Sequence, residues 1–192
     1  MQGDARKICL IATEESGDRL GAGLMHELRA RLGETVCFEG VGGRTMAEAG
    51  LASRFPIEEL SIVGLAAVAK QLRSILRRIR ETADAVIAAK PEALIIIDSP
   101  DFTHRVAKRV RARAPQIPII DYVSPQVWAW RPGRARVMRS YIDHVLAILP
   151  FEPEALRKLD GPPCTFVGHP LTAQIGSLRP DSTEQLRRDD SP

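Results

Sequence analysis

Seven short apolar segments recur along the chain, and stretches with helical spacing separate them. β-branched and other apolar residues dominate these segments, and small or acidic residues close them, a pattern typical of strands. The segments are residues 7–13, 36–42, 52–56, 93–98, 117–123, 144–150 and 164–168. Strands that alternate with helices in this way predict an α/β fold with a mostly parallel sheet and crossover helices.

Two of the segments, 93–98 and 117–123, are apolar almost throughout. Strands of this composition are buried on both faces, so the sequence predicts a doubly wound, Rossmann-like sheet with helices on each side. A chain of 192 residues is long enough for one such domain. We expect this domain to cover residues 1–175 and a polar linker or tail to follow at 176–192.

The helices have recognisable starts and stops. The first is expected from Ser16, as its N-cap, to residue 32, with a buried leucine every fourth position. A short helix ends at Gly50, and a long one, in one or two pieces, covers 64–90. Two more are expected at 105–114 and 126–142, the latter divided at Pro132 and Gly133.

The amino-acid composition and net charge exclude some classes of protein but do not identify the ligand. A net charge of +3 and a pI near 9.0 suit nucleic acid, anionic lipid or phosphorylated ligands about equally. No apolar run approaches the roughly 20 residues of a membrane-spanning helix, and residues 1–13 lack the apolar core of a secretory signal. The three cysteines are far apart and form no CxxC pair. We therefore expect a cytoplasmic protein with no cofactor and no metal site.

Candidate chemistry lies where ligands collect in such sheets, at the carboxyl ends of the strands. The turn at 16–18 could contact a phosphate or hydroxyl group through a helix N-terminus, but no GxGxxG motif accompanies it, and simple capping is equally consistent. Asp98 closes an apolar strand. Spacing alone favours Asp98 as a cap over a catalyst, with Asp101 better placed as the structural cap.

Two further segments carry unusual side chains. The loop at 122–134 concentrates tryptophan, proline and arginine beside a strand end, which favours ligand binding slightly over local packing. Its candidate residues are Ser124, Gln126, Trp128, Trp130 and Arg131. His169 follows the last strand, where a lone histidine is more often structural than functional. No metal-ligand spacing surrounds His169.

The long helix is amphipathic and basic. Its apolar stripe consists of Leu65, Val68, Leu72, Ile75, Leu76 and Ile79, and its cationic stripe of Lys70, Arg73, Arg77 and Arg80. Such a helix most often packs on a sheet with its charges in water. The alternatives are an anionic membrane surface and, more weakly, nucleic acid, for which no recognised fold or stacking platform is present.

Taken together, the motifs resemble a known family. The segments "ATEESGDRLGAGLM", "KPEALIIIDSPDF", "YVSPQVWAWRPGR", "LAILPFE" and "FVGHPL" are similar, in order and spacing, to the amino-terminal half of lipid-A-disaccharide synthases. The resemblance runs from Lys7 to about Leu171. It implies the amino-terminal domain of a glycosyltransferase-B architecture, found in enzymes peripheral to the inner membrane of Gram-negative bacteria.

The resemblance also implies a reaction and roles for residues. The family transfers 2,3-diacylglucosamine from UDP to 2,3-diacylglucosamine 1-phosphate, giving a β-1,6 disaccharide of lipopolysaccharide biosynthesis, without a metal. Asp98 matches the proposed general base. The acceptor side matches Ser16, Asp18 and the loop at 124–131, with Glu15 keeping an acidic position and His169 in the GHP motif. Membrane contact maps to Val63, Leu65, Val68, Leu72, Arg73, Ile75 and Leu76.

Two departures accompany the resemblance. Thr13 and Glu14 stand where many members have Gly-Glu. The chain also stops where the UDP-sugar domain of the family begins, so we expect little turnover from it alone and a possible separate carboxyl-terminal half as partner. The alternatives are a non-catalytic lipid-binding module and another glycosyltransferase-B member, such as a UDP-sugar epimerase.

Overall fold

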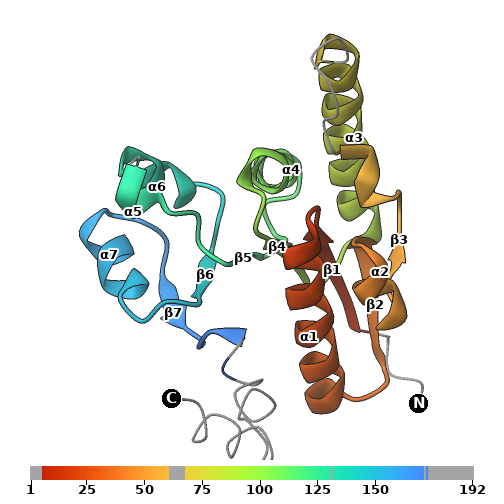
Figure 1. Cartoon of the computed structure of the whole chain (residues 1–192), viewed down its shortest axis with the longest axis horizontal. Helices are drawn as coiled ribbons and strands as arrows, with labels where there is room; N and C mark the ends of the chain where they lie inside the picture. The colour runs from red at the N-terminus through yellow and green to blue at the C-terminus, as the bar shows by residue number, and fades with distance from the viewer. Residues whose placement is uncertain (1–5, 61–67, 131, 171, 173–192) are drawn as a thin grey trace, which may run out of the picture.

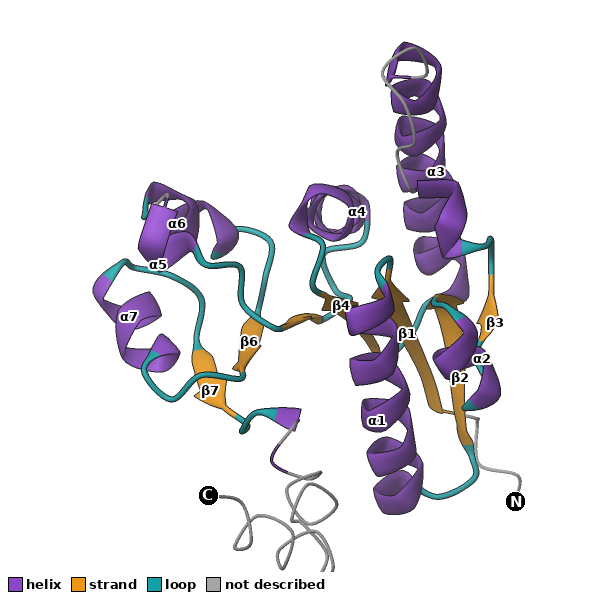
Figure 2. Ribbon diagram, viewed as in Figure 1, coloured by secondary structure: helices purple, strands orange, loops and turns teal. Residues whose placement is uncertain are grey.

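A single parallel sheet organises the molecule. The computed structural model describes residues 6–60, 68–130, 132–170 and 172. Its strands are β1 (Arg6–Ala12), β2 (Val36–Val41), β3 (Ala52–Ser53), β4 (Ala93–Ile97), β5 (Ile119–Tyr122), β6 (His144–Ala147) and β7 (Cys164–Phe166). All neighbouring strands are parallel, in the order β3-β2-β1-β4-β5-β6-β7, from right to left in Figure 2. The seven predicted strands and the doubly wound α/β fold are thus confirmed.

Helices cover both faces of this sheet (Figure 1). They are α1 (Glu15–Leu32), α2 (Arg44–Glu48), the 3-10 helix η1 (Ile57–Leu60), α3 (Val68–Ala89), α4 (Pro100–Arg113), α5 (Val127–Trp130), α6 (Gly133–Met138) and α7 (Glu152–Lys158). The sequence pattern did not predict η1 or α7, and it placed the start of α4 five residues too late. The expected tail at 176–192 lies outside the described residues.

The side-chain alternation of β1 separates two apolar layers. Cys9 and Ile11 join a cluster with residues of α3 and α4, whereas Ile8, Leu10 and Ala12 join one with residues of α1 and α2. Each face of a central strand therefore meets a helical layer, which explains why these strands are apolar throughout.

The start and the buried face of α1 differ from the expectation. Glu14 is the N-cap residue and makes no side-chain capping bond, so the prediction of Ser16 as N-cap is wrong. The most deeply buried positions include Gly21 and Met25, and the predicted leucines flank them. A Cβ on Gly21 would lie 2.5 Å from Sδ of Met46, so the glycine permits close packing of α1 on α2.

The amino-terminal turns of α3 stand clear of the sheet, at the upper right of Figure 1. Ile79 is fully buried, Ile75 and Leu76 are half-buried, and Leu72 is 51% exposed. The apolar stripe therefore leaves the core as it approaches the start of the helix. Val63 and Leu65 lie outside the described residues, as does the side chain of Val68.

Candidate active site

Three of the five described non-glycine residues with positive φ lie at two neighbouring strand ends, and the other two are Lys90 and Asp160. Asp98 and Ser99, directly after β4, have φ values of 51° and 46°, and Val123, directly after β5, has φ 75°. Left-handed backbone costs an L-residue roughly 1–2 kcal/mol, and it is an outlier for a β-branched residue. Strain of this kind persists where the surroundings enforce it and clusters at functional sites. The carboxyl edge between β4 and β5 is therefore the leading candidate for the active site.

A set of hydrogen bonds holds the strained turn at Asp98. The backbone N–H of Asp98 donates to the carbonyl of Tyr122 at 3.2 Å. Oγ1 of Thr103 donates to the carbonyls of Asp98, at 2.7 Å, and Ser99, at 3.0 Å. The N–H of Ser99 donates to Oδ1 of Asp98 at 2.8 Å. Among the described residues nothing binds Oδ2, so a half-buried Asp98 keeps one carboxylate oxygen for a ligand.

Glu14 meets this turn from the neighbouring strand. Oγ of Ser99 donates to Oε1 of Glu14 at 2.6 Å, which ties the end of β1 to the end of β4. These two strands are adjacent at the point where the strand order reverses, the usual position of a ligand crevice in open α/β sheets. A hollow of about 450 Å³ opens here, with Glu14, Ile75, Ser99 and Asp101 among its lining residues.

Asp18 supports this edge from inside the protein. Its carboxylate is 2% exposed and accepts the backbone N–H groups of Gly43 (2.7 Å), Thr45 (2.8 Å) and Met46 (3.0 Å). A Cβ on Gly43 would lie 2.8 Å from Oδ2 of Asp18. The side chain therefore caps α2 and fixes the loop after β2, and its oxygens are occupied by protein donors.

A second hollow, of about 700 Å³, lies beside the first, on the other side of Pro100 and Asp101. It opens between α4 and α6 and is rich in cationic side chains. Arg105, Lys108 and Arg109 come from α4 and Arg134 from α6. Its apolar lining residues include Leu76, Val127, Val137 and Met138.

A buried polar cluster closes the floor of the second hollow. Nε2 of His104 lies 3.3 Å from Oδ2 of Asp121, and Nδ1 lies 3.0 Å from the hydroxyl of Tyr141. Neither oxygen of Asp121 has a well-aligned hydrogen-bond donor among the described residues. Burial raises the pKa of Asp121, His104 opposes that shift, and the charge of Asp98 adds to it. Burial and the charge of Asp121 raise the pKa of Tyr141 to about 12.

The loop after β5 is tied to the strand end after β6. Nε1 of Trp128 donates to Oε1 of Glu152 at 3.4 Å, and the ring of Trp128 meets that of Phe151 edge-on, with centroids 4.9 Å apart. Glu152 is 2% exposed and also accepts the N–H of Leu149 at 3.0 Å. Trp128 thus packs within the protein. The sequence had slightly favoured ligand binding over such packing for this loop.

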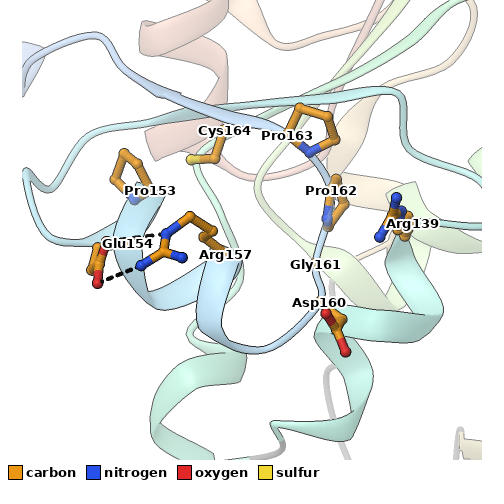
Figure 3. A pocket seen from close by; sticks show the side chains of 9 residues that line it. All are labelled: Arg139, Pro153, Glu154, Arg157, Asp160, Gly161, Pro162, Pro163 and Cys164. Atoms are coloured by element: carbon orange, nitrogen blue, oxygen red, sulfur yellow. Dashed lines mark hydrogen bonds and ion pairs between the residues drawn. The ribbon is translucent and has the colours of Figure 1, made fainter.

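A third hollow, shown in Figure 3, lies away from these groups. Its residues come from α7, from the loop between α7 and β7, from the residue after α6 and from the start of β7, so it opens at the amino edge of β7. Arg157 is already paired with Glu154 there, with 2.9 Å between Nη2 and Oε1. This hollow lies away from the carboxyl edge of the sheet and is therefore not the candidate site.

The structure brings together only some of the candidates from the sequence. Asp98 lies at the strained turn, and Ile75 and Leu76 each line a neighbouring hollow. The other candidates have different surroundings. Glu15 pairs with Arg19 at 3.0 Å, and Ser16 and Gln126 are exposed. Ser124 is buried, and its hydroxyl donates to the carbonyl of Pro125. His169 is half-buried, and its carbonyl accepts from Thr172. Arg131 and the side chain of Trp130 lie outside the described set.

Asp101 does not have the structural role expected of it. It is exposed and makes no side-chain hydrogen bond with any described residue, and Ser99 is the N-cap residue of α4. The capping prediction for Asp101 is therefore wrong.

Several groups that border the site were not predicted from the sequence, namely Glu14, His104, Asp121 and the cations of α4. The position of Asp121 inside the apolar run of β5 could have identified it from the sequence, because a carboxylate is rarely buried in a strand without a partner.

Comparison with known proteins places the chain in a family. The sequence profile described as "Lipid-A-disaccharide synthetase" matches residues 8–189. The chain belongs to this family. The lipid-A-disaccharide synthase of Nitrobacter hamburgensis is 72% identical over 188 residues, which are 98% of this chain and 48% of that protein. The synthase of Rhodospirillum centenum is 51% identical over 164 residues, or 85% of this chain and 41% of that protein.

The family resemblance read from the motifs is thus confirmed, and the chain spans about half the length of the curated relatives it matches. A solved structure of UDP-GlcNAc 2-epimerase from Neisseria meningitidis, bound to UDP-GlcNAc, aligns with 96% of this chain and 52% of its own. Its TM-score is 0.59 at 12% identity, which is a likeness of fold alone. Membership of the lipid-A-disaccharide synthetase family therefore rests on sequence, and the epimerase shares the architecture.

Among the described residues, no three histidine, cysteine or acidic side chains are grouped closely enough to hold a metal ion. No helix in the described ranges is both long and apolar enough to cross a membrane.

Proposed function

We propose that this chain forms the acceptor-side half of a lipid-A-disaccharide synthase. The observation that carries the proposal is Asp98, which stands at a strained strand end with Oδ2 unoccupied by any described residue. Its place in the DSPDF motif matches the catalytic position that the family resemblance implies, and the curated relatives carry the synthase name. The substrates are UDP-2,3-diacylglucosamine as donor and 2,3-diacylglucosamine 1-phosphate as acceptor.

Asp98 acts as the general base in this mechanism. Oδ2 accepts the proton of the acceptor's primary hydroxyl as the hydroxyl oxygen attacks the anomeric carbon of the donor. The bond between that carbon and the UDP oxygen breaks on the opposite face, so configuration inverts and UDP leaves with the bonding electrons. A positioned base of this kind typically contributes about 10²–10⁴-fold to a rate.

The neighbouring groups orient the base and the acceptor. Thr103 and the N–H of Ser99 fix the rotation of the Asp98 turn, and Glu14 fixes the hydroxyl of Ser99. Asp18 acts through the loop that it caps. Ser16 and Gln126, being exposed near the same edge, are available to contact the acceptor directly.

The exposed end of α3 supplies contact with a membrane surface. Leu72 is half exposed and Arg73 is exposed beside it, with the half-buried Ile75 and Leu76 on the following turn. Apolar side chains beside cations suit the boundary between acyl chains and anionic headgroups, each basic residue adding about 1 kcal/mol near the surface. The enzyme thereby reaches acylated substrates as a peripheral protein of the inner membrane.

The donor is held by the part of the synthase that follows the matched half in the relatives. Binding of the two substrates by opposed domains orients the hydroxyl and the anomeric carbon for reaction. Asp98 alone supplies a base without the donor opposite it, so transfer requires both halves.

The test is a hybrid enzyme in which residues 1–192 are joined to the remaining carboxyl-terminal half of the Nitrobacter hamburgensis synthase. Disaccharide formation from the two substrates is followed by mass spectrometry. We expect transfer by the hybrid, little by residues 1–192 alone, and a loss of about 10²–10⁴-fold with Asp98→Asn. Asp160→Asn, in an exposed carboxylate beside the third hollow and away from the candidate site, is the control and retains activity. Near-normal transfer by the folded Asp98→Asn hybrid refutes the assignment of the base.

A further inference from the structure

The cationic hollow between α4 and α6 has a charge that the protein itself does not balance. Arg105, Lys108 and Arg109 occupy successive positions on one face of α4, and Arg134 enters from α6. Asp101 is the single carboxylate among the residues that line it. Four permanent cations around one concavity repel one another, and low-dielectric walls focus their field into it.

The other two arginines in the last turn of α4 do have acidic partners. Elsewhere on α4, Arg111 pairs with Asp143 and Arg113 pairs with Asp84. In contrast, the four cations of the hollow form no ion pair with any described residue. The one contact shown for Lys108 is with the Tyr141 ring, 4.9 Å from Nζ to the centroid.

A buried donor adds to the same imbalance. Nε of Arg109 is buried and has no hydrogen-bond partner in the described part of the chain. A buried donor without an acceptor is unfavourable, and a bound anion beside this guanidinium would supply the missing acceptor. The planar fork of arginine matches the oxygens of a phosphate in pairs.

The rest of the lining excludes a free inorganic anion as the best match. Leu76, Val127, Val137 and Met138 share the hollow with the cations, and Val137 is 53% exposed. The volume, about 700 Å³, exceeds that of a phosphate ion and is in the range of sites that hold a small organic ligand. The complementary ligand therefore carries both an anion and an apolar part.

We propose that this hollow binds a phosphate monoester borne by an amphiphile. A monoester presents three free oxygens and a charge near −2 at neutral pH, whereas the diester of a bulk phospholipid presents two free oxygens and one charge. Four cations in one cavity thus favour the monoester. The inference rests on the proposed function only in naming the carrier, since the acceptor, 2,3-diacylglucosamine 1-phosphate, is such an amphiphile.

Binding is tested on residues 1–192 by calorimetric titration with octyl phosphate, a monoester with one short chain. Octyl glucoside is the neutral control and inorganic phosphate the control without a chain. We expect octyl phosphate to bind more tightly than either. Arg105→Gln and Arg134→Gln should each weaken it by about tenfold or more, because each removes a charge-assisted bond. Arg136→Gln, on the same helix as Arg134 but outside the hollow, should change it less than twofold.

A second arm separates the two lipid sources. Phosphatidylglycerol vesicles present only diesters, and their sedimentation with the chain should be nearly unchanged by Arg134→Gln. Binding of octyl phosphate no tighter than that of octyl glucoside overturns the proposal. The proposal is also overturned if Arg136→Gln weakens octyl phosphate binding as much as Arg134→Gln does. It is likewise overturned if vesicle binding depends on Arg134 while octyl phosphate does not bind.

The result is independent of sugar transfer. If octyl phosphate binds as expected but the hybrid enzyme forms no disaccharide, the proposed function fails and the phosphate site stands. If the hybrid forms disaccharide and Arg134→Gln leaves both octyl phosphate binding and the acceptor KM unchanged, the phosphate site fails and the proposed function stands.

Discussion

Nε2 of His104, on α4, lies 3.3 Å from Oδ2 of Asp121, on β5, inside the protein. Asp121 is 1% exposed, and among the described residues the charge of Asp98, at the end of the adjacent strand, adds to the effect of burial in raising its pKa. His104 continues the contact to the hydroxyl of Tyr141. The candidate base therefore stands near a buried carboxyl group on the adjacent strand, whose titration is measurable.

The first prediction concerns the pH dependence of stability. Burial raises the folded-state pKa of Asp121 above its unfolded value of about 3.9. The folded state then holds a proton more tightly than the unfolded state, so this contribution is complete below about pH 3.9 and is lost as pH rises through the folded value. Asp121→Asn removes the titration, and its stability relative to the parent should increase across that interval. Urea unfolding at a series of pH values measures this, and a pH-independent difference contradicts it.

The second prediction concerns Asp18. Its carboxylate accepts three backbone N–H groups, and Asp18→Ala leaves these donors without their acceptor. We expect a loss of about 2–4 kcal/mol in the free energy of unfolding, measured by denaturant titration. Asp101→Asn, at an exposed residue without a side-chain bond to any described residue, should change it by less than about 0.5 kcal/mol. A change of less than about 0.5 kcal/mol for Asp18→Ala as well would show that the cap is unimportant.

The third prediction concerns the clamp on the strained turn. Thr103→Val keeps the shape of a fully buried side chain but removes the donor to the carbonyls of Asp98 and Ser99. We expect a loss of about 1–3 kcal/mol in unfolding free energy and, in the hybrid enzyme, a fall in kcat larger than any rise in KM. Thr103→Ser retains the hydroxyl and should largely restore kcat. A valine variant with full kcat argues against a positioning role.

The fourth prediction concerns thiol reactivity, which requires the thiolate. Burial raises the pKa of Cys9 to about 12 and that of Cys164 to about 11, whereas Cys37 is exposed. Iodoacetamide at pH 8 should therefore modify Cys37 first and Cys9 last. Peptide mass spectrometry at timed intervals gives the order, and urea should remove the differences. Early modification of Cys9 in the folded chain contradicts its burial.

The fifth prediction concerns the exposed end of α3. Leu72→Glu replaces an exposed apolar side chain with an anion, so sedimentation with phosphatidylglycerol vesicles should fall several-fold. Val167→Glu, which alters an exposed apolar residue just after β7, is the control for added charge and should have a smaller effect. Raised salt should weaken parental binding. Equal loss in both variants would assign the effect to net charge.

The strands could be predicted well from the sequence because each central strand is buried on both faces, and a short, continuous apolar run bounded by turn residues is typical of such a strand. Prediction failed where the backbone is strained. Asp98 and Ser99 resemble an ordinary strand end and helix start, and nothing in their composition shows that both adopt left-handed backbone. The start of α4 and the role of Asp101 were misjudged for the same reason.

Other misses arose from contacts between distant segments. Glu14 and Glu15 are equivalent as neighbouring acids in the sequence, but only Glu14 lies where β1 meets β4 and can bond Ser99. In the sequence the cations of α4 are typical of a solvent-exposed helix face, and the structure adds Arg134 of α6 to the same hollow. Tertiary placement, which spacing along one helix does not contain, decides such cases.

The strand order also has a consequence during synthesis on the ribosome. β1 is central in the sheet, but its second neighbour, β4, begins about 80 residues after β1 ends. At roughly 5–20 residues per second, the nascent chain carries an apolar strand with one open edge for several seconds. Of the inner strands of the described sheet, β1 therefore waits longest between its own synthesis and the arrival of its second neighbour, and during that interval its open edge is a template for pairing with another molecule.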